Sequence, residues 1–154
     1  MAKRFLIIIA VVLYFGCNLS PREKLCAVTE ALDGDTIKVM CEGEEKKAHL
    51  LRLRTPFRGK NGYEEAVEAM NKLVVGKEVR LEFEKSRKVQ TNYFGDYLCY
   101  VFVDDLNVNI EMVRLGYSTF WTHFGAGRFA DEFLEAEREA RSNKRGIWAS
   151  NKEN

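Results

Sequence analysis

Alternating apolar and polar positions predict strands along much of this chain. Between Thr36 and Cys41, apolar side chains occupy every second position, at Ile37, Val39 and Cys41. A period of two places such side chains on one face of a strand. This alternation, and short apolar runs bounded by turn residues, predict strands over residues 26–32, 36–41, 47–53, 78–84 and 97–103.

Apolar residues at helical spacing predict three helices, over residues 63–75, 108–115 and 129–141. In the first, Val67, Met70, Leu73 and Val74 share one face, and Gly76 ends the helix. The order is therefore three strands, a helix, two strands and two helices. This order predicts an α+β, mainly β, fold: a five-stranded OB-type Greek-key barrel with about three packed helices.

The first residues have the pattern of an export signal rather than of a folded element. Two basic residues precede a continuous apolar run, residues 5–15, which is too short to span a bilayer comfortably. Cys17 follows in a sequence that resembles a bacterial lipoprotein box, although Tyr14 and Phe15 are bulkier than usual there. We predict a signal peptide over residues 1–16, a tether over 17–24 lipidated at Cys17, and one domain over 25–150. Plain secretion and an uncleaved anchor are the alternatives.

Export predicts a location in the periplasm or at the cell surface, with the lipid anchor as the contact with a membrane. Such compartments permit disulfides. The Asp-Gly dipeptide at residues 33–34 predicts a two-residue hairpin turn, and that turn places Cys26 directly opposite Cys41. We therefore expect a Cys26–Cys41 disulfide, with two buried free thiols as the alternative. Cys99 remains as an unpaired thiol in the core.

The charge balance gives weak support for nucleic acid as a partner. The chain has 24 Lys and Arg against 23 Asp and Glu, and its formal net charge is +1. Proteins that contact many phosphates are usually clearly basic. A local cluster at Arg52, Arg54, Arg58 and Lys60 favours phosphate contact, and the alternative is a solvated loop. No protein partner is indicated by the sequence.

A series of short motifs follows in order between residues 26 and 148. They are Leu32-Asp33-Gly34-Asp35-Thr36, Leu50-Leu51 before Thr55-Pro56, Gly62-Tyr63-Glu64-Glu65-Ala66, Tyr93-Phe94-Gly95, Val108-Asn109 with Val113-Arg114-Leu115-Gly116-Tyr117, and Glu135-Ala136-Glu137 with Ala140-Arg141 and Gly146-Ile147-Trp148. In this order and spacing the chain resembles the staphylococcal-nuclease-like (thermonuclease) family. The resemblance covers nearly the whole predicted domain.

The resemblance implies a calcium-dependent phosphodiesterase site. Active members of the family are expected to hold the cation with two aspartates and a threonine carbonyl, because a hard cation prefers oxygen ligands. A glutamate two residues after that threonine positions the attacking water. Two arginines neutralise the charge that develops on the phosphate.

Carried over by position, much of this site is replaced. Asp35 matches the first aspartate and Thr55 matches the threonine, so these two are remnants of the calcium ligands. The other positions hold His49 for the first arginine, Arg54 for the second aspartate, Phe57 for the glutamate and Asp96 for the second arginine.

Two of these replacements reverse the charge. Arg54 puts a cation where a calcium ligand should be, and Asp96 puts an anion where the phosphate should be bound. We expect these two side chains to form a salt bridge across the former site, with two solvated surface charges as the alternative. The replacements predict an envelope-located binding or structural module without calcium-dependent phosphodiesterase activity. The alternative is a secreted nuclease with an altered site, which hydrolyses DNA or RNA and keeps calcium as its cofactor.

Other residues are candidates for replacement chemistry or for binding. His49 could act as a general base, although a single histidine on a strand is more often structural. Glu64 and Glu65 could also act as bases, although acids are favourable in the first turn of a helix. The aromatic loop Phe120-Trp121-Thr122-His123-Phe124 either covers the core, the interpretation we favour, or forms a platform for bases or sugars.

Overall fold

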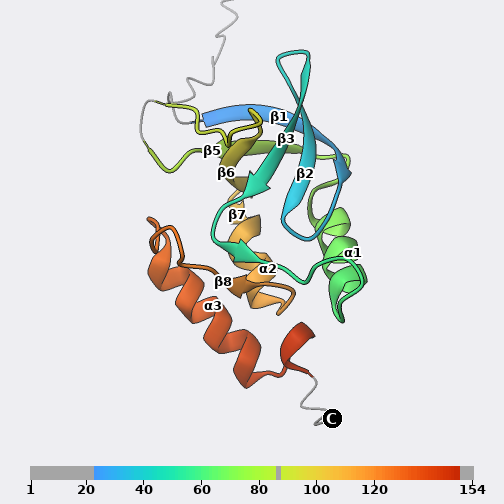
Figure 1. Ribbon diagram of the computed structural model, residues 1–154, viewed down its shortest axis with the longest axis vertical. Coiled ribbons are helices and arrows are strands. Elements are labelled where there is room, and N and C mark those ends of the chain that lie inside the picture. The colour runs from blue at the N-terminus through green and yellow to red at the C-terminus, as the bar shows by residue number, and fades with distance from the viewer. Residues whose placement is uncertain (1–22, 86–87, 150–154) are drawn as a thin grey trace, which may run out of the picture.

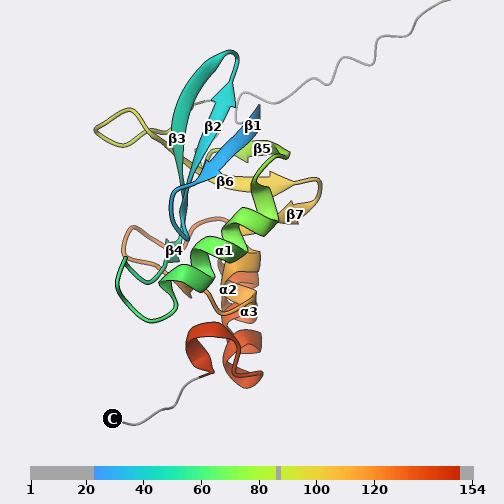
Figure 2. The ribbon, with the colours of Figure 1, turned by 90° about the vertical axis from the view of Figure 1, so that its right-hand side faces the viewer.

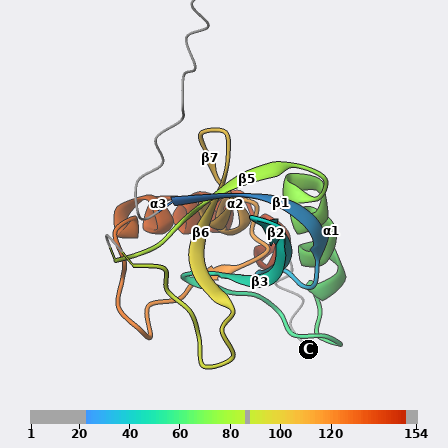
Figure 3. The same ribbon diagram turned by 90° about the horizontal axis from the view of Figure 1, so that it is seen from above.

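The computed structural model describes residues 23–85 and 88–149 (Figure 1). A six-stranded sheet has the order β3-β2-β1-β5-β6-β7, and a parallel pairing of β3 with β6 closes five of its strands into a barrel (Figure 3). The strands are β1 (Glu23–Ala31), β2 (Thr36–Cys41), β3 (Glu44–Leu50), β5 (Glu78–Glu82), β6 (Tyr97–Val103) and β7 (Leu106–Asn107). The predicted mainly β fold with an OB-type barrel is confirmed.

The helices gather at one end of the barrel (Figure 2). They are α1 (Tyr63–Val74), α2 (Val108–Arg114) and α3 (Ala130–Ser142), followed by the short 3-10 helix η1 (Gly146–Trp148). Met70 and Val74 of α1 are fully buried, but Val67 and Leu73 are only partly so. No helix in the described part of the chain is long and apolar enough to cross a membrane.

The turn between β1 and β2 differs from the expected two-residue turn. The amide of Leu32 donates to the carbonyl of Thr36, so the turn contains three residues, 33–35. Strand β1 also contains one extra residue, because its register against β2 shifts between Val28 and Glu30. This bulge compensates for the longer turn, since each shifts the pairing by one residue in the opposite sense.

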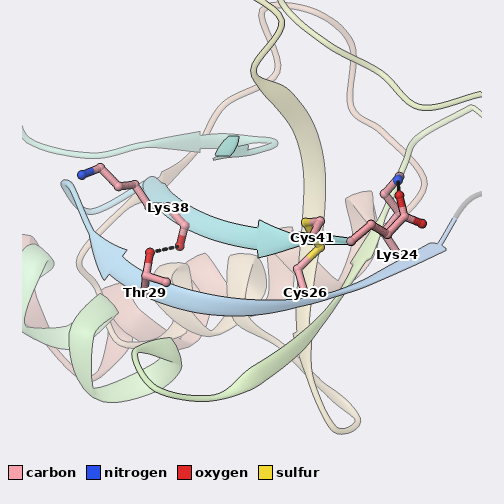
Figure 4. The surroundings of a disulfide bond; sticks show 6 residues. Lys24, Cys26, Thr29, Lys38 and Cys41 are labelled. Atoms are coloured by element: carbon pink, nitrogen blue, oxygen red, sulfur yellow. Dashed lines mark hydrogen bonds and ion pairs between the residues drawn. A yellow bond between two sulfur atoms is a disulfide. The ribbon is translucent and has the colours of Figure 1, made fainter. Parts of the chain in front are cut away.

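The compensation brings Cys26 and Cys41 together, as the sequence predicted. Beyond the bulge Ala27 pairs with Met40, and the neighbouring cysteines form a disulfide with their Cα atoms 4.5 Å apart (Figure 4). Both half-cystines are buried, and Cys99 is a buried free thiol, also as predicted.

The strand predicted over residues 47–53 is two strands. β3 begins at Glu44 and ends at Leu50, and a separate short strand, β4 (Leu53–Arg54), pairs with β8 (Thr119–Phe120). Arg52 lies between them with a φ of 67°, a conformation in which a strand cannot continue. The break turns the chain away from the barrel and carries residues 53–57 toward the helices.

Asn109 fixes this break against the barrel. Its buried side chain accepts a hydrogen bond from the amide of Val101 and donates to the carbonyls of Leu51 and Cys99. One asparagine therefore joins α2, β6 and the residue before Arg52. Strand β1 starts at Glu23, two residues before the predicted domain boundary, whereas the predicted signal peptide and Cys17 lie outside the described residues.

Candidate functional site

Segments that are far apart in the sequence surround a cavity of about 530 Å³ at one side of the barrel. They are the β1–β2 turn, the break after β3, the end of β5, the segment before β6 and the loop after β8. Its walls include Asp35, His49, Arg52, Glu84, Trp121 and Phe124.

Asp35, the one carboxylate retained from the expected calcium site, is fully engaged by neighbouring hydroxyls. Its Oδ1 accepts a hydrogen bond from Thr36 Oγ1 at 3.0 Å, and its Oδ2 accepts one from Thr55 Oγ1 at 2.7 Å. The amide of Asp35 donates to Asp33 Oδ1, so Asp33 serves the turn as expected. Burial raises the pKa of Asp35, the Thr55 hydrogen bond opposes this, and the nearby Asp33 carboxylate raises the pKa further.

Asp96 pairs with His49, so the expected Arg54–Asp96 salt bridge is wrong. His49 Nε2 lies 3.1 Å from Asp96 Oδ2, and Asn92 donates to the same oxygen at 3.1 Å. Burial alone would raise the pKa of Asp96, but the hydrogen bonds from His49 and Asn92 outweigh it and lower the pKa. Among the described residues, no carboxylate forms an ion pair with Arg54.

His49 lies between Asp96 and the retained Asp35. Its Nδ1 lies 3.0 Å from Thr36 Oγ1, and that hydroxyl also contacts Asp35. Because an ionised Asp96 can only accept, Nε2 of His49 must carry a proton. When His49 is neutral, its Nδ1 accepts a hydrogen bond from the Thr36 hydroxyl. When His49 is charged, its Nδ1 donates to Thr36 Oγ1, and the Thr36 hydroxyl donates to Asp35. The hydrogen-bonded chain that starts at Asp96 therefore reaches Asp35 only when both ring nitrogens of His49 carry a proton.

Arg54 and Phe57 line a second cavity, of about 390 Å³, together with Asp35, Thr55 and Trp121. The amide of Arg54 donates to Ser118 Oγ, which holds the backbone, while the side chain is exposed. The Phe57 side chain is 72% exposed. The structure therefore brings the two replaced residues to the same hollow as the retained Asp35.

The residues at this site do not suit the calcium coordination that is expected in active members of the family. The ion needs several oxygen ligands. Oδ2 of Asp35 already accepts a hydrogen bond from Thr55, and the neighbouring ligand position contributes the guanidinium of Arg54. Within residues 23–85 and 88–149, no three His, Cys, Asp or Glu side chains are grouped so that they could hold a metal ion.

The candidate replacement bases on α1 lie away from these two cavities. Glu64 and Glu65 occupy the exposed first turn of the helix. Neither lines the cavities at Asp35, and Glu65 instead lines a hollow with Tyr117 and Ile147. Their position supports the structural interpretation, in which first-turn acids favour the helix N-terminus.

The aromatic loop is largely exposed, so the favoured interpretation that it covers the core is wrong for most of its residues. Only Phe120 is packed inward, where it stacks on Phe133 with ring centroids 4.9 Å apart. Trp121, His123 and Phe124 form an exposed aromatic cluster, in which the Trp121 and His123 rings are nearly parallel and Phe124 meets both edge-on. Trp121 is 38% exposed and Phe124 74% exposed.

Arg52 holds this cluster at the cavity, a role that the sequence did not indicate. Its side chain is only 10% exposed; Nη1 donates to the carbonyl of Phe124 at 3.1 Å, and Nη2 lies 3.4 Å from Glu84 Oε2. The carbonyl of Arg52 accepts from the amide of Trp121 at 2.9 Å. Arg52 is therefore largely buried and differs from a residue of a solvated loop, which was the alternative for the basic cluster.

Glu84 anchors the far end of the same loop. Its Oε1 accepts from the amide of Arg128 at 3.1 Å, and its Oε2 accepts a short hydrogen bond from the Tyr100 hydroxyl. Burial and this hydrogen bond raise the pKa of Tyr100 to about 12. The loop passes so close that a Cβ at Gly127 would meet the Tyr100 hydroxyl and Arg52 Nε. No motif marked these residues, because they meet only in the folded chain.

Comparison with known proteins agrees with this architecture. A family model described as staphylococcal nuclease homologue matches residues 45–150. Endonuclease YncB of Bacillus subtilis (strain 168) is 32% identical over 137 residues, which cover 83% of this chain and 64% of that protein. An uncharacterized endonuclease of Escherichia coli O157:H7 is 31% identical over 132 residues (81% and 80%). The uncharacterized protein MJ1439 of Methanocaldococcus jannaschii is 29% identical over 147 residues (79% and 70%).

Proposed function

The chain belongs to the staphylococcal nuclease homologue family, and on that premise we propose that it binds single-stranded nucleic acid without calcium-dependent hydrolysis. The observation that carries the proposal is the exposed aromatic cluster of Trp121, His123 and Phe124 at the edge of the main cavity. Unpaired bases stack on such rings whatever their sequence.

Acidic and basic side chains are balanced around the main cavity, so charge contributes little to holding a strand there. Arg52 and Lys85 line the cavity, and the guanidinium of Arg52 is held beside the cluster. Asp35 and Glu84 also line it, but the oxygens of both carboxylates accept hydrogen bonds from neighbouring groups. Since the whole chain is nearly neutral, we expect stacking to contribute more of the affinity than phosphate contacts do.

The loss of calcium-dependent hydrolysis rests on the replaced residues. Water needs a base to become a nucleophile, and Phe57 supplies none where the glutamate is expected. Arg54 repels a cation at the ligand position, and Asp96, held by His49, repels the scissile phosphate. Binding of nucleic acid does not need the glutamate, the second aspartate or the second arginine of the calcium site. It therefore tolerates the replacement of all three.

We also propose that the chain acts outside the cytoplasm, in the periplasm or at the cell surface, anchored by lipid at Cys17. The Cys26–Cys41 disulfide supports this location, because such bonds persist in oxidising compartments. Labelled fatty acid should be incorporated in a bacterial host and lost in Cys17→Ala. Equal labelling of both forms would contradict the anchor.

Binding of a fluorescent oligothymidylate to the full chain, in EDTA, tests the main proposal. We expect saturable binding that weakens in Trp121→Ala and Phe124→Ala by roughly 5- to 150-fold each, the range for one lost base stack. Leu134→Ala, an exposed apolar position on α3, is the matched control. Peptidoglycan fragments serve as the competing ligand. If the chain bound these fragments and not the oligonucleotide, the proposal would be wrong.

A second candidate function, phosphodiester hydrolysis by an altered site, is favoured by His49, which lines the main cavity and pairs with Asp96. Two of the relatives are also named as endonucleases. A histidine oriented by a carboxylate can act as a general base near neutral pH. This function predicts hydrolysis that persists in EDTA and is lost in His49→Ala, whereas a binding domain shows no turnover in either protein.

A further inference from the structure

Trp121 lines two neighbouring hollows, which also share Asp35 and Leu53. It lines the main cavity of about 530 Å³ together with Phe124, and it also lines the second cavity of about 390 Å³ together with Arg54 and Phe57. The position of Trp121 is fixed from the backbone, because its amide donates to the carbonyl of Arg52. A strand stacked on Trp121 from the main cavity would therefore enter the second cavity with its next nucleotide.

A third hollow continues the same path. It measures about 330 Å³, and Arg54 and Phe57 line it as well as the second cavity. The exposed Lys60 also lines it. The path is therefore lined by aromatic and basic side chains, in the order Trp121, Phe57 with Arg54, and Lys60.

We propose that Arg54 and Phe57 form a second nucleotide subsite beside the aromatic cluster. In this subsite a base stacks on the Phe57 ring and the adjoining phosphodiester pairs with the Arg54 guanidinium. The chain then holds at least two consecutive nucleotides of a single strand. This inference rests on the proposed binding function and adds to it the residues that replaced a calcium ligand and a water-positioning acid.

The exposure of the Phe57 and Arg54 side chains supports their role in a nucleotide subsite. Phe57 is 72% exposed, and within the described part of the chain its ring packs on no other aromatic ring. The Arg54 guanidinium, which is exposed, forms no hydrogen bond or ion pair with the described residues, so its donors are available for a phosphate. Stacking a flat base on an isolated, exposed phenyl ring is favourable, because it removes apolar surface from water.

The nearest opposing charge is the carboxylate of Asp35, which hydrogen-bonds to neighbouring hydroxyls. Asp35 lines the second cavity, and its carboxylate would repel a phosphate placed against it. Its Oδ2, however, accepts a hydrogen bond from Thr55, and its Oδ1 lies 3.0 Å from Thr36 Oγ1. The phosphate is therefore expected on the Arg54 and Lys60 side of Phe57, with the base on the Asp35 side.

The test measures the affinity of the full chain for oligothymidylates of increasing length, in EDTA, by fluorescence anisotropy. Phe57→Ala should weaken binding of a long strand by roughly 5- to 150-fold, the range for one stacked base. Arg54→Gln should lower the slope of log affinity against log salt by about 0.7, the value for one phosphate contact in a single strand. Both variants should bind a mononucleotide like the wild type, because the aromatic cluster is intact.

Two exposed positions on α3 serve as matched controls, Leu134→Ala for the ring and Arg138→Gln for the charge. Neither lines the three hollows. Because Phe57 and Arg54 are exposed, the variants should fold, and equal thermal unfolding curves confirm this.

Two results would overturn the second subsite while leaving the proposed function intact. The first is wild-type affinity for long strands in Phe57→Ala and Arg54→Gln, with weakened binding in Trp121→Ala. The second is that the two variants lose binding only to vesicles containing anionic phospholipid, which would assign Arg54 and Phe57 to a membrane surface. If the wild type bound no strand at all, the proposed function itself would fail.

Discussion

Replacing Arg52 tests whether the aromatic loop is held in place by this one side chain. Arg52 is nine-tenths buried, donates to the carbonyl of Phe124 at 3.1 Å and lies 3.4 Å from Glu84. We consider Arg52→Met, because methionine keeps much of the apolar stem and removes only the guanidinium. The carbonyl of Phe124 would lose its donor, and Glu84 would lose one of its partners.

The expected cost follows from these two contacts. A hydrogen bond to a charged group contributes about 1.5–3 kcal/mol, so the loss of the Phe124 contact alone costs about 2 kcal/mol. The Glu84 contact adds less, because 3.4 Å exceeds the roughly 2.8 Å of a strong charge-assisted bond. We therefore expect a loss of about 2–3 kcal/mol of unfolding free energy, which lowers the urea midpoint by about 1 M.

Urea unfolding followed by circular dichroism measures this loss, and oligothymidylate affinity measures its consequence for the loop. Arg138→Met, an exposed arginine with its own ion pair, should change the unfolding free energy by less than about 0.5 kcal/mol. The double variant Arg52→Met/Glu84→Gln should be less destabilised than the sum of the single variants, because the two side chains interact. A wild-type urea midpoint together with wild-type affinity in Arg52→Met would refute the role given to Arg52.

Two further predictions concern the β1–β2 hairpin. The Cys26–Cys41 disulfide closes a separation of 15 residues, so Cys26→Ala/Cys41→Ala should lower the unfolding free energy by about 3 kcal/mol. In urea titrations, reductant should destabilise the wild type and not this variant; an effect of similar size on both would contradict the prediction. Burial holds the pKa of Asp35 above its ordinary 3.8, so the ionised carboxylate opposes folding and its cost disappears as the pH falls below 3.8. Asp35→Asn should therefore raise the urea midpoint at pH 7 and raise it less at pH 4, and a lower midpoint at pH 7 would contradict this.

Local patterns in the sequence were sufficient for most of the fold. The alternation of Val79, Leu81 and Phe83 is reproduced by three buried side chains, because a half-buried strand requires that period. The disulfide was predicted through a turn of the wrong length, and it forms because a bulge in β1 restores the register. The prediction therefore missed both the three-residue turn and the bulge, whose effects on the register cancel. A bulge leaves little trace in the sequence, so only the structure reveals these two differences.

The candidate site was less predictable, because it depends on contacts between distant residues. Family positions located Asp35, Arg54 and Phe57 at one hollow, but they did not show that Asp96 would pair with His49. The break at Arg52 was hidden inside an apparently continuous strand pattern. It is stabilised by Asn109 and by the loop after β8, which lie more than fifty residues away in the sequence.

Hydrolysis of single-stranded DNA and RNA by the full chain, in calcium and then in EDTA, tests the central claim most directly. Asp35→Ala is assayed beside the wild type. The account predicts no calcium-dependent turnover above that of the variant, together with saturable binding of the same strands. Calcium-dependent turnover that is lost in Asp35→Ala would contradict it, because Arg54 and Asp96 would then be tolerated in a working calcium site.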